Sequence, residues 1–255
     1  MPFDGGYLDV LASKCRGAST GLQTPPEVLE TCAMTKTALT PDRDALKRVG
    51  DIVRKRLEAD PKAYKIPTDR AEIFAVGKFL TGIECTRLMR MIDVVAQPSK
   101  LFDQDYSTGI RTSYSGNFDA RDPFVQGISR RIDDLLGMKP ECGETIQGQR
   151  YLPGQEFKPH NDWFYTDQDY WKPERKRGGQ RSWTAMAFLN PVDKGGETHF
   201  TEIGISIAPK PGVLLVWNNA LPDGRPNPDT MHAGTPVIEG IKYVITKWYR
   251  TRPWK

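Results

Sequence analysis

Short apolar segments alternate with turn residues throughout the second half of the chain. After residue 145, runs of β-branched and aromatic residues are separated by turn sequences such as Pro153-Gly154, Gly195-Gly196 and Pro211-Gly212. This pattern predicts strands over residues 145–151, 157–164, 183–189, 204–207, 213–217, 235–238 and 242–249. The second half of the chain is therefore expected to form sheets of many short strands.

The first part of the chain has helical spacing instead. Apolar residues recur at helical intervals before Pro61, which predicts a helix with Thr40 as its cap and Pro41 at its first position. A shorter helix is expected over residues 27–38. We expect residues 1–71 to form a helical N-terminal extension that packs on the remainder or binds a partner.

Residues 72–255 are predicted to form the main domain. A short strand at 73–76 precedes the capping box Thr81-Gly82-Ile83-Glu84 of one helix, and a second helix begins at Asp122-Pro123 and ends at Gly137. Helices followed by many short strands are typical of a mostly β protein with flanking helices, either a β-sandwich or a jelly roll. The helices are expected to cover one side of the sheet.

Composition narrows the function classes. The net charge of +4 is too small to require a nucleic-acid partner. No apolar run approaches the roughly 18–20 residues that cross a bilayer, and the first residues do not resemble a signal peptide, so no membrane association and a cytoplasmic location are expected. Because the cysteines at 15, 32, 85 and 142 are widely spaced, they are interpreted as free structural thiols of a reducing compartment.

His160 and Asp162 are the first candidates for chemistry. Residues i and i+2 of an extended strand project from the same face, so the imidazole and the carboxylate are predicted to point together. They form two-thirds of the facial triad that binds iron in non-haem oxygenases. A lone His-x-Asp is a weak signal, but His232 lies downstream as a third candidate ligand. The other histidine, His199, is interpreted as a polar strand residue.

Lys242 begins a predicted strand whose alternate residues include Val244 and Trp248, so its ammonium is expected to point inward. An unpaired buried ammonium is costly, and Lys242 therefore needs an anionic partner. An internal salt bridge to Asp or Glu is one alternative. The other is a dicarboxylate co-substrate such as 2-oxoglutarate, which an iron oxygenase would use.

These residues resemble the metal and 2-oxoglutarate motif of the Fe(II)/2-oxoglutarate dioxygenases, specifically the prolyl 4-hydroxylase family. His232 and Lys242 are separated by the family's ten-residue step, and the likeness covers roughly residues 72–250. The other motifs that are similar to the family occur in order: Arg111-Thr112-Ser113, Arg150-Tyr151-Leu152-Pro153-Gly154-Gln155, Gly195-Gly196-Glu197-Thr198, Pro211-Gly212-Val213-Leu214-Leu215-Val216-Trp217 and His232-Ala233-Gly234-Thr235-Pro236-Val237.

The resemblance implies a double-stranded β-helix (jelly-roll) core buttressed by the N-terminal helices. It implies Fe(II) held by His160, Asp162 and His232, and 2-oxoglutarate held by Lys242 with Tyr151 in the pocket. O2 is the further co-substrate, and ascorbate is included among the expected cofactors. One departure is Phe157, which stands where the family often has a tyrosine that hydrogen-bonds 2-oxoglutarate.

The expected activity is hydroxylation of proline in a peptide or protein, with release of succinate and CO2. The alternatives are a hydroxylase of a free amino acid or other small molecule, a catalytically silent jelly-roll binding protein, and a zinc hydrolase, which would not need Lys242. The aromatic, then basic, segment 163–181 is interpreted either as core packing followed by a solvated loop or as a substrate lid with a Gly178-Gly179 hinge. Expected substrate contacts are Trp248, Arg111, Trp163 and Tyr165.

Overall fold

An eight-stranded antiparallel sheet carries the architecture. The computed structural model describes residues 42–99 and 110–254. The large sheet has the strand order β1-β2-β11-β7-β14-β5-β4-β3. Its strands are β1 (Ala63–Lys65), β2 (Ile73–Val76), β11 (Leu214–Asn218), β7 (Arg181–Phe188), β14 (Lys242–Arg250), β5 (Gln147–Tyr151), β4 (Tyr114–Asn117) and β3 (Gln97–Pro98).

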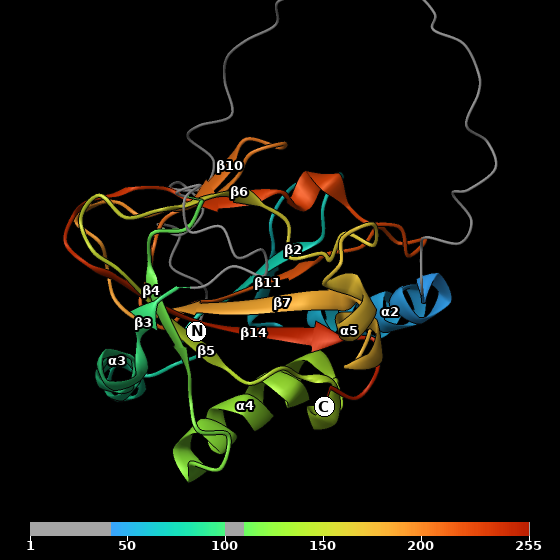
Figure 1. The fold of residues 1–255 in the computed structure, drawn as a ribbon, viewed down its shortest axis with the longest axis horizontal. Coiled ribbons are helices and arrows are strands. Elements are labelled where there is room, and N and C mark those ends of the chain that lie inside the picture. The colour runs from blue at the N-terminus through green and yellow to red at the C-terminus, as the bar shows by residue number, and fades with distance from the viewer. Residues whose placement is uncertain (1–41, 100–109, 255) are drawn as a thin grey trace, which may run out of the picture. The chain divides into compact units, whose positions relative to one another are not determined.

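A smaller sheet lies over the opposite face from the helices, as Figure 1 shows. It has four strands in the order β10-β9-β12-β6. A separate two-stranded sheet pairs β13 with β8; along the chain, β8 precedes β9 and β13 follows β12. Two facing sheets with a helical layer outside form the jelly-roll core that the sequence predicts. The strands are β6 (Phe157–His160), β9 (Thr198–Phe200), β10 (Ile205–Ile207), β12 (His232–Gly234), β8 (Lys194–Gly195) and β13 (Val237–Glu239).

Three long helices cover the outer face of the large sheet (Figure 1). Their apolar stripes share one buried cluster with Trp183 of β7 and Ile245 of β14. The helices are α2 (Arg43–Ala59), α3 (Gly82–Val95) and α4 (Pro123–Leu136), and shorter ones are α5 (Trp171–Lys176), η3 (Pro140–Cys142) and η4 (Pro228–Thr230).

The helix boundaries follow the predicted caps closely. Thr81 and Glu84 form the capping box of α3, and α4 has Asp122 as its cap and ends at Gly137 with φ 65°. The helix α2 is confirmed, although its cap position is occupied by Asp42 in a left-handed conformation, without a side-chain cap bond. Residues 27–38 and the proposed cap Thr40 lie outside the described residues.

Several strand predictions need correction. The strand expected over 157–164 ends at His160, and the strand expected over 235–238 is β13, which begins only at Val237. The short strands β1, β3, β4, β8, β9 and β12 were not predicted. Each has two to four residues, too few for an alternation of apolar and polar positions to stand out from chance.

Strand β14 separates the two halves of the interior. Its outer face carries Ile245 and Tyr249 into the cluster under the helices. Lys247 on this same face is paired with the buried Asp133 of α4. The alternate residues, which begin with Lys242, face the space between the sheets, as the pattern of the sequence predicts. The candidate functional site lies on that inner side.

Candidate active site

His160 and His232 are directly opposite each other across the antiparallel pair β6–β12. Their ring centroids are 4.3 Å apart. Potential ligand atoms of His160, Asp162 and His232 all lie within 4.8 Å of one another, and this is the one such cluster found among residues 42–99 and 110–254. The structure therefore brings together the three residues that the sequence singles out.

Asp162 reaches this cluster by a different route from the predicted one. β6 ends at His160, and Asp162 lies in a bend beyond the strand. The Thr184 hydroxyl donates a hydrogen bond to its Oδ2 at 2.7 Å, and the Asn219 side-chain amide donates to Thr184 Oγ1 at 2.9 Å. The carboxylate is therefore oriented by neighbouring strands rather than by strand alternation.

Both histidines are held in one tautomer. Nδ1 of His160 lies 2.8 Å from the Lys158 carbonyl oxygen, and Nδ1 of His232 lies 2.9 Å from the Thr230 carbonyl oxygen. A carbonyl oxygen only accepts, so each Nδ1 carries the proton and donates it. Each Nε2 then has a free lone pair, which is the arrangement expected of a metal ligand whose orientation is fixed by a hydrogen bond on the other ring nitrogen.

Protonation of the cluster also suits a divalent cation. Burial lowers the pKa of His160 to about 3, so that its ring is neutral at physiological pH. Burial opposes ionisation of Asp162, but electrostatic interactions with His232, His160 and Arg181 hold its pKa below the ordinary value. Two imidazoles and one carboxylate form the ligand set that leaves open coordination positions on Fe(II).

Lys242 is the fourth predicted residue, and it lies inside the barrel. It is the first residue of β14, directly opposite Tyr151 in β5, and is 3% exposed. Its Nζ lies 5.3 Å from the ring centroid of Tyr151 and 5.9 Å from that of Phe188. No carboxylate of the described residues lies within 4.0 Å of this ammonium, so the internal salt bridge is not found there.

Burial lowers the pKa of Lys242 to about 8, with Glu197 acting in the opposite direction. The effect of burial is thus larger than that of Glu197. The Glu197 carboxylate itself accepts a hydrogen bond from Thr235 at 2.6 Å. Tyr151 is 4% exposed, and its hydroxyl donates to Gln149 at 2.8 Å. A buried ammonium beside a tyrosine forms a site for an anionic group.

Phe157 forms the middle layer of a stack at the metal-ligand cluster. Its ring lies parallel to that of His160, with 3.5 Å between the centroids and 13° between the planes. The Arg111 guanidinium lies 4.8 Å from the Phe157 centroid on its other side and donates to Ser113 and Gln147. Arg111, predicted as a substrate contact, therefore packs on the ring that stacks against His160, and its charge also acts on His160 and Asp162.

Arg181 was missed as a site residue because the sequence placed it in a solvated basic loop. It begins β7, is 8% exposed and donates two hydrogen bonds to Glu144 at 2.7 and 2.8 Å. Its guanidinium lies 4.1 Å from the centroid of Trp248 and 4.8 Å from that of Phe164. The sequence did contain one indication that Arg181 is buried: it directly precedes the apolar residues of the predicted strand over 183–189.

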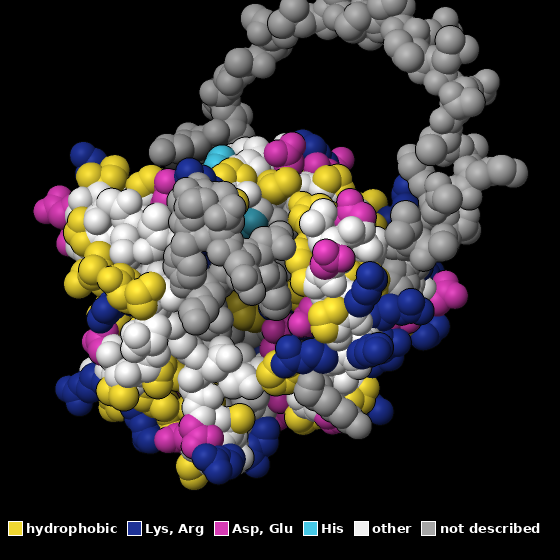
Figure 2. Space-filling view, in the orientation of Figure 1, with side chains coloured by type: hydrophobic (Ala, Val, Ile, Leu, Met, Phe, Trp, Pro, Cys, Tyr) yellow, Lys and Arg dark blue, Asp and Glu magenta, His cyan; other side chains and the backbone are white. Residues whose placement is uncertain are grey.

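The aromatic segment after Asp162 divides into buried and exposed parts. Trp163 is buried against Leu46 and Ala220, and Trp171 is also buried, which supports the core-packing alternative for both. Tyr165 is 49% exposed. Exposed basic side chains gather over α5 and α2 (Figure 2); in and just after α5 they are Lys172, Arg175, Lys176 and Arg177.

The predicted hinge glycines are tied to the end of β14. Arg250 donates to the Gly179 carbonyl at 2.7 Å, and the Arg252 amide donates to the Gly178 carbonyl at 3.1 Å. Arg250 also pairs with the buried Glu174 of α5 at 2.6 Å. These contacts fix the glycines to the body of the domain, and they do not support the interpretation of Gly178-Gly179 as a hinge.

Three other expectations have plain outcomes. His199 lies on β9 and contacts Ser206 at 2.7 Å, away from the cluster. Cys85 and Cys142 are free and buried. In the described part of the chain, no helix has the length and apolar character that a membrane span requires.

Comparison with known proteins places this site in a family. The family model of the 2OG-Fe(II) oxygenase superfamily matches residues 146–250. Prolyl 4-hydroxylase 2 of Arabidopsis thaliana is 32% identical over 216 residues, covering 74% of this chain and 70% of that protein. The chicken (Gallus gallus) prolyl 4-hydroxylase subunit alpha-1 is 36% identical over 131 residues, 51% of this chain and 25% of that subunit.

Solved structures agree with this assignment. The viral collagen prolyl hydroxylase of Paramecium Bursaria Chlorella virus-1, solved as a 2-oxoglutarate complex, is 28% identical, with a TM-score of 0.55 over 70% of this chain and 94% of that one. With the jelly-roll fold, the family match and the relatives all in agreement, the chain belongs to the prolyl 4-hydroxylase family of Fe(II)- and 2-oxoglutarate-dependent dioxygenases.

Proposed function

We propose that this enzyme hydroxylates a proline residue within a peptide or protein and converts 2-oxoglutarate and O2 to succinate and CO2. The observation that carries the proposal is the buried Lys242 ammonium, which has no carboxylate within 4.0 Å in the described chain and belongs to the same interior as the three-residue ligand cluster. A zinc hydrolase would have no use for this ammonium. The names of the relatives, which are prolyl hydroxylases, support proline as the target.

In this proposal His160 and His232 bind Fe(II) through Nε2, and Asp162 binds it through a carboxylate oxygen. Bound iron supplies the activation of O2 and the oxidative decarboxylation of 2-oxoglutarate that end in hydroxylation of a C–H bond. Lys242 binds the carboxylate of 2-oxoglutarate that is remote from the metal, with Tyr151 beside it. With one protein carboxylate the metal keeps a single positive charge, and the Lys242 ammonium balances the remaining charge of the dianion.

The residues around the ligands are proposed to hold them and to exclude water. Thr184 and Asn219 fix the orientation of Asp162, and Phe157 covers one face of His160. Because Phe157 has no hydroxyl group, it cannot donate to 2-oxoglutarate. Binding of the remote carboxylate then depends on Lys242 and Tyr151 more than it would in a relative with tyrosine at this position.

Trp248 and Tyr165 are the proposed substrate contacts. The Trp248 ring, covered by the Arg181 guanidinium, would form one wall of the proline site, and the exposed Tyr165 would lie at its rim. Arg111 is proposed to act as a positioning residue through Phe157. Trp163, buried against Leu46, would support the loop of Asp162 from behind. Ascorbate is proposed as an accessory cofactor on the strength of family membership alone.

The test is a paired measurement on the purified full-length chain with Fe(II), 2-oxoglutarate and a proline-rich peptide. Succinate formation reports consumption of 2-oxoglutarate, and mass spectrometry of the peptide reports oxygen added to proline. We expect both, with succinate formation stimulated by the peptide. Oxidation of free proline at the same rate as the peptide would favour a small-molecule hydroxylase, and the absence of succinate would overturn the assignment. Omission of ascorbate tests its part.

A further inference from the structure

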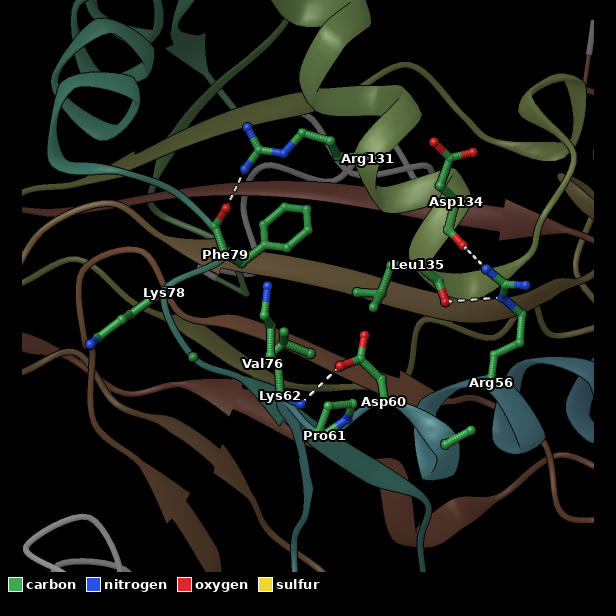
Figure 3. A pocket seen from close by; sticks show the side chains of 12 residues that line it. Arg56, Asp60, Pro61, Lys62, Val76, Lys78, Phe79, Arg131, Asp134 and Leu135 are labelled. Carbon is green, nitrogen blue, oxygen red and sulfur yellow. Dashed lines mark hydrogen bonds between the residues drawn. The ribbon is translucent and has the colours of Figure 1, made fainter. Parts of the chain in front are cut away.

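Polar side chains that the proposed mechanism does not use lie on both sides of the large sheet. On the helical side, a groove between α2, the turn after β2 and α4 is lined by basic and acidic residues together. In Figure 3 its Arg131 donates to the Phe79 carbonyl, and its Arg56 donates to the carbonyls at the end of α4. These contacts are internal to the groove and indicate no ligand. On the inner side, polar residues instead lead to the proposed co-substrate site.

Alternate side chains of β5 face the inner side of the sheet. They are Gln147, Gln149 and Tyr151, directly opposite Thr246, Val244 and Lys242 of β14. Gln149 is 5% exposed, so its amide is removed from water and must find hydrogen-bond partners within the protein. An apolar side chain at this position would have no such requirement, and the partners of the glutamine therefore indicate what it does.

The hydrogen bonds of Gln149 run in one direction, which Arg111 sets. A guanidinium only donates, and Arg111 Nη2 lies 3.2 Å from Gln147 Oε1, so this oxygen accepts. The atom of Gln149 that lies 3.3 Å from the same oxygen must then be its amide nitrogen, which also donates to Thr246 at 3.1 Å. The other end of the Gln149 amide is therefore its carbonyl oxygen, and it faces Tyr151.

This carbonyl oxygen takes the hydroxyl proton of Tyr151. The hydroxyl lies 2.8 Å from Gln149 Oε1 and donates to it. Burial raises the pKa of Tyr151, so the hydroxyl is protonated at physiological pH and has this one proton to donate. An anion beside Lys242 therefore receives no hydrogen bond from Tyr151 unless the bond to Gln149 is broken.

We propose that Gln149 is a positioning residue that competes with 2-oxoglutarate for the Tyr151 hydroxyl proton and thereby lowers the affinity of the enzyme for this co-substrate. The inference deepens the proposed function and rests on it, because it takes the space beside Lys242 as the site of the remote carboxylate. Breaking the bond between Tyr151 and Gln149 leaves a buried carbonyl oxygen without a donor, which opposes binding. With a lower affinity, the rate of hydroxylation follows the supply of 2-oxoglutarate over a wider range of concentrations.

The experiment removes the acceptor and keeps the shape of the side chain. Gln149→Met replaces the amide by a thioether of similar length, so that the Tyr151 hydroxyl is free to donate to the carboxylate. Because a hydrogen bond to a charged group is stronger than one between neutral groups, the dissociation constant for 2-oxoglutarate should fall about tenfold. Calorimetric titration of the Fe(II)-loaded full chain without O2 measures this constant. A purely structural role for Gln149 predicts weaker binding instead.

Three controls connect the gain in affinity to the Tyr151 proton. In a Tyr151→Phe background, Gln149→Met should change the dissociation constant by less than about threefold, because no hydroxyl is left to release. The compound 2-oxobutyrate, which lacks the remote carboxylate, should bind equally to the parent and to the Gln149→Met variant. Gln126→Met is the matched substitution at an exposed glutamine, whose amide donates to the Ala120 carbonyl, and it should leave the affinity unchanged.

Gln149→Leu is a second variant that removes the same acceptor, and the unfolding transition of each variant checks that it is folded. Unchanged or weaker binding in both Gln149 variants, failure of both to fold, or a gain that persists without the Tyr151 hydroxyl would overturn the inference. If the parent itself bound no 2-oxoglutarate, the proposed function would be overturned as well, so the two failures are distinguishable.

Discussion

Lys242 and Tyr151 are directly paired across β14 and β5, with the lysine Nζ 5.3 Å from the tyrosine ring centroid. Lys242 is the residue predicted to bind 2-oxoglutarate, and Tyr151 is the residue predicted to lie beside it in the pocket. Both residues are buried, 3% and 4% exposed. An anion that enters this space meets the Lys242 ammonium with the Tyr151 ring beside it.

Lys242→Ala should raise the KM for 2-oxoglutarate steeply. Removing one partner of a buried charge pair costs about 3–5 kcal/mol, which corresponds to roughly a hundredfold to a few thousandfold in affinity. Iron content, measured by elemental analysis, should remain near that of the parent, because the lysine is not a ligand. Lys194→Ala, at an exposed lysine of β8, is the control. A KM within about threefold of the parent would mean that another residue binds the carboxylate.

The affinity for 2-oxoglutarate should also fall above pH 8. The pKa of Lys242 in the free protein is about 8, and a bound dianion raises it. Below pH 8 the ammonium is protonated in both states, so the affinity is independent of this group. Above pH 8 binding must take up a proton, and the dissociation constant should increase about tenfold per pH unit. Calorimetric titration checks this, and Lys242→Arg, which stays charged, should lack the dependence.

The ligand assignment predicts a contrast between two histidines. His232→Ala and Asp162→Ala should each abolish turnover and deplete bound iron, because they remove one of three ligand groups that lie within 4.8 Å of each other. His199→Ala should retain iron, since that ring contacts Ser206 on the neighbouring strand. Equal loss of iron in the His199 variant would show that the triad is wrongly assigned.

Thr184→Val should weaken metal binding without removing a ligand. The substitution deletes the hydroxyl that donates to Asp162 Oδ2 at 2.7 Å while keeping the shape of the side chain. Loss of such an outer hydrogen bond typically costs about 10–100-fold in metal affinity or activity. Competition with a chelator gives the measurement. Ser182→Ala, two positions earlier on β7 with its hydroxyl bonded to the Tyr249 carbonyl, is the control and should bind metal normally.

Lys247→Met should destabilise the fold by about 3–5 kcal/mol, because it leaves the Asp133 carboxylate buried without its cation. Denaturant unfolding measures the change in the free energy of unfolding. The double variant Lys247→Met with Asp133→Leu should recover part of the loss, since both charges are then absent. A loss below about 1 kcal/mol in the single variant would mean that solvent reaches the carboxylate.

Local signals accounted for the elements that were predicted correctly. The capping box at Thr81 and the Asp122 cap with Gly137 at the other end are contained within single helices, so neighbouring residues suffice to define them. Lys242 was predicted to face inward because alternation along a long strand is also a local property. The resemblance to a known family then favoured His232, already a candidate, as the third proposed ligand.

What was missed depends on contacts between distant segments. Arg181 looked like the end of a basic loop, yet Glu144 lies 37 positions away and makes it a buried residue of the site. Trp163 followed the metal ligands and suggested a lid, but Leu46 and Ala220 enclose it. Asp162 was expected on a strand, whereas Thr184 of another strand fixes its position. None of these partners can be paired from one sequence by spacing alone.

The two faces of β14 carry different functional side chains, and this limits insertions and deletions in the strand. Lys242 and Trp248 project to one side of the strand, and Lys247 and Tyr249 project to the other, into α4. Insertion or deletion of one residue in this strand would exchange the two sets, sending the co-substrate lysine into the helical layer and the helix-pairing lysine into the barrel. We therefore expect β14 to tolerate a one-residue insertion or deletion only at its ends. Side chains of β14 can be substituted, but the number of residues in the strand must stay the same.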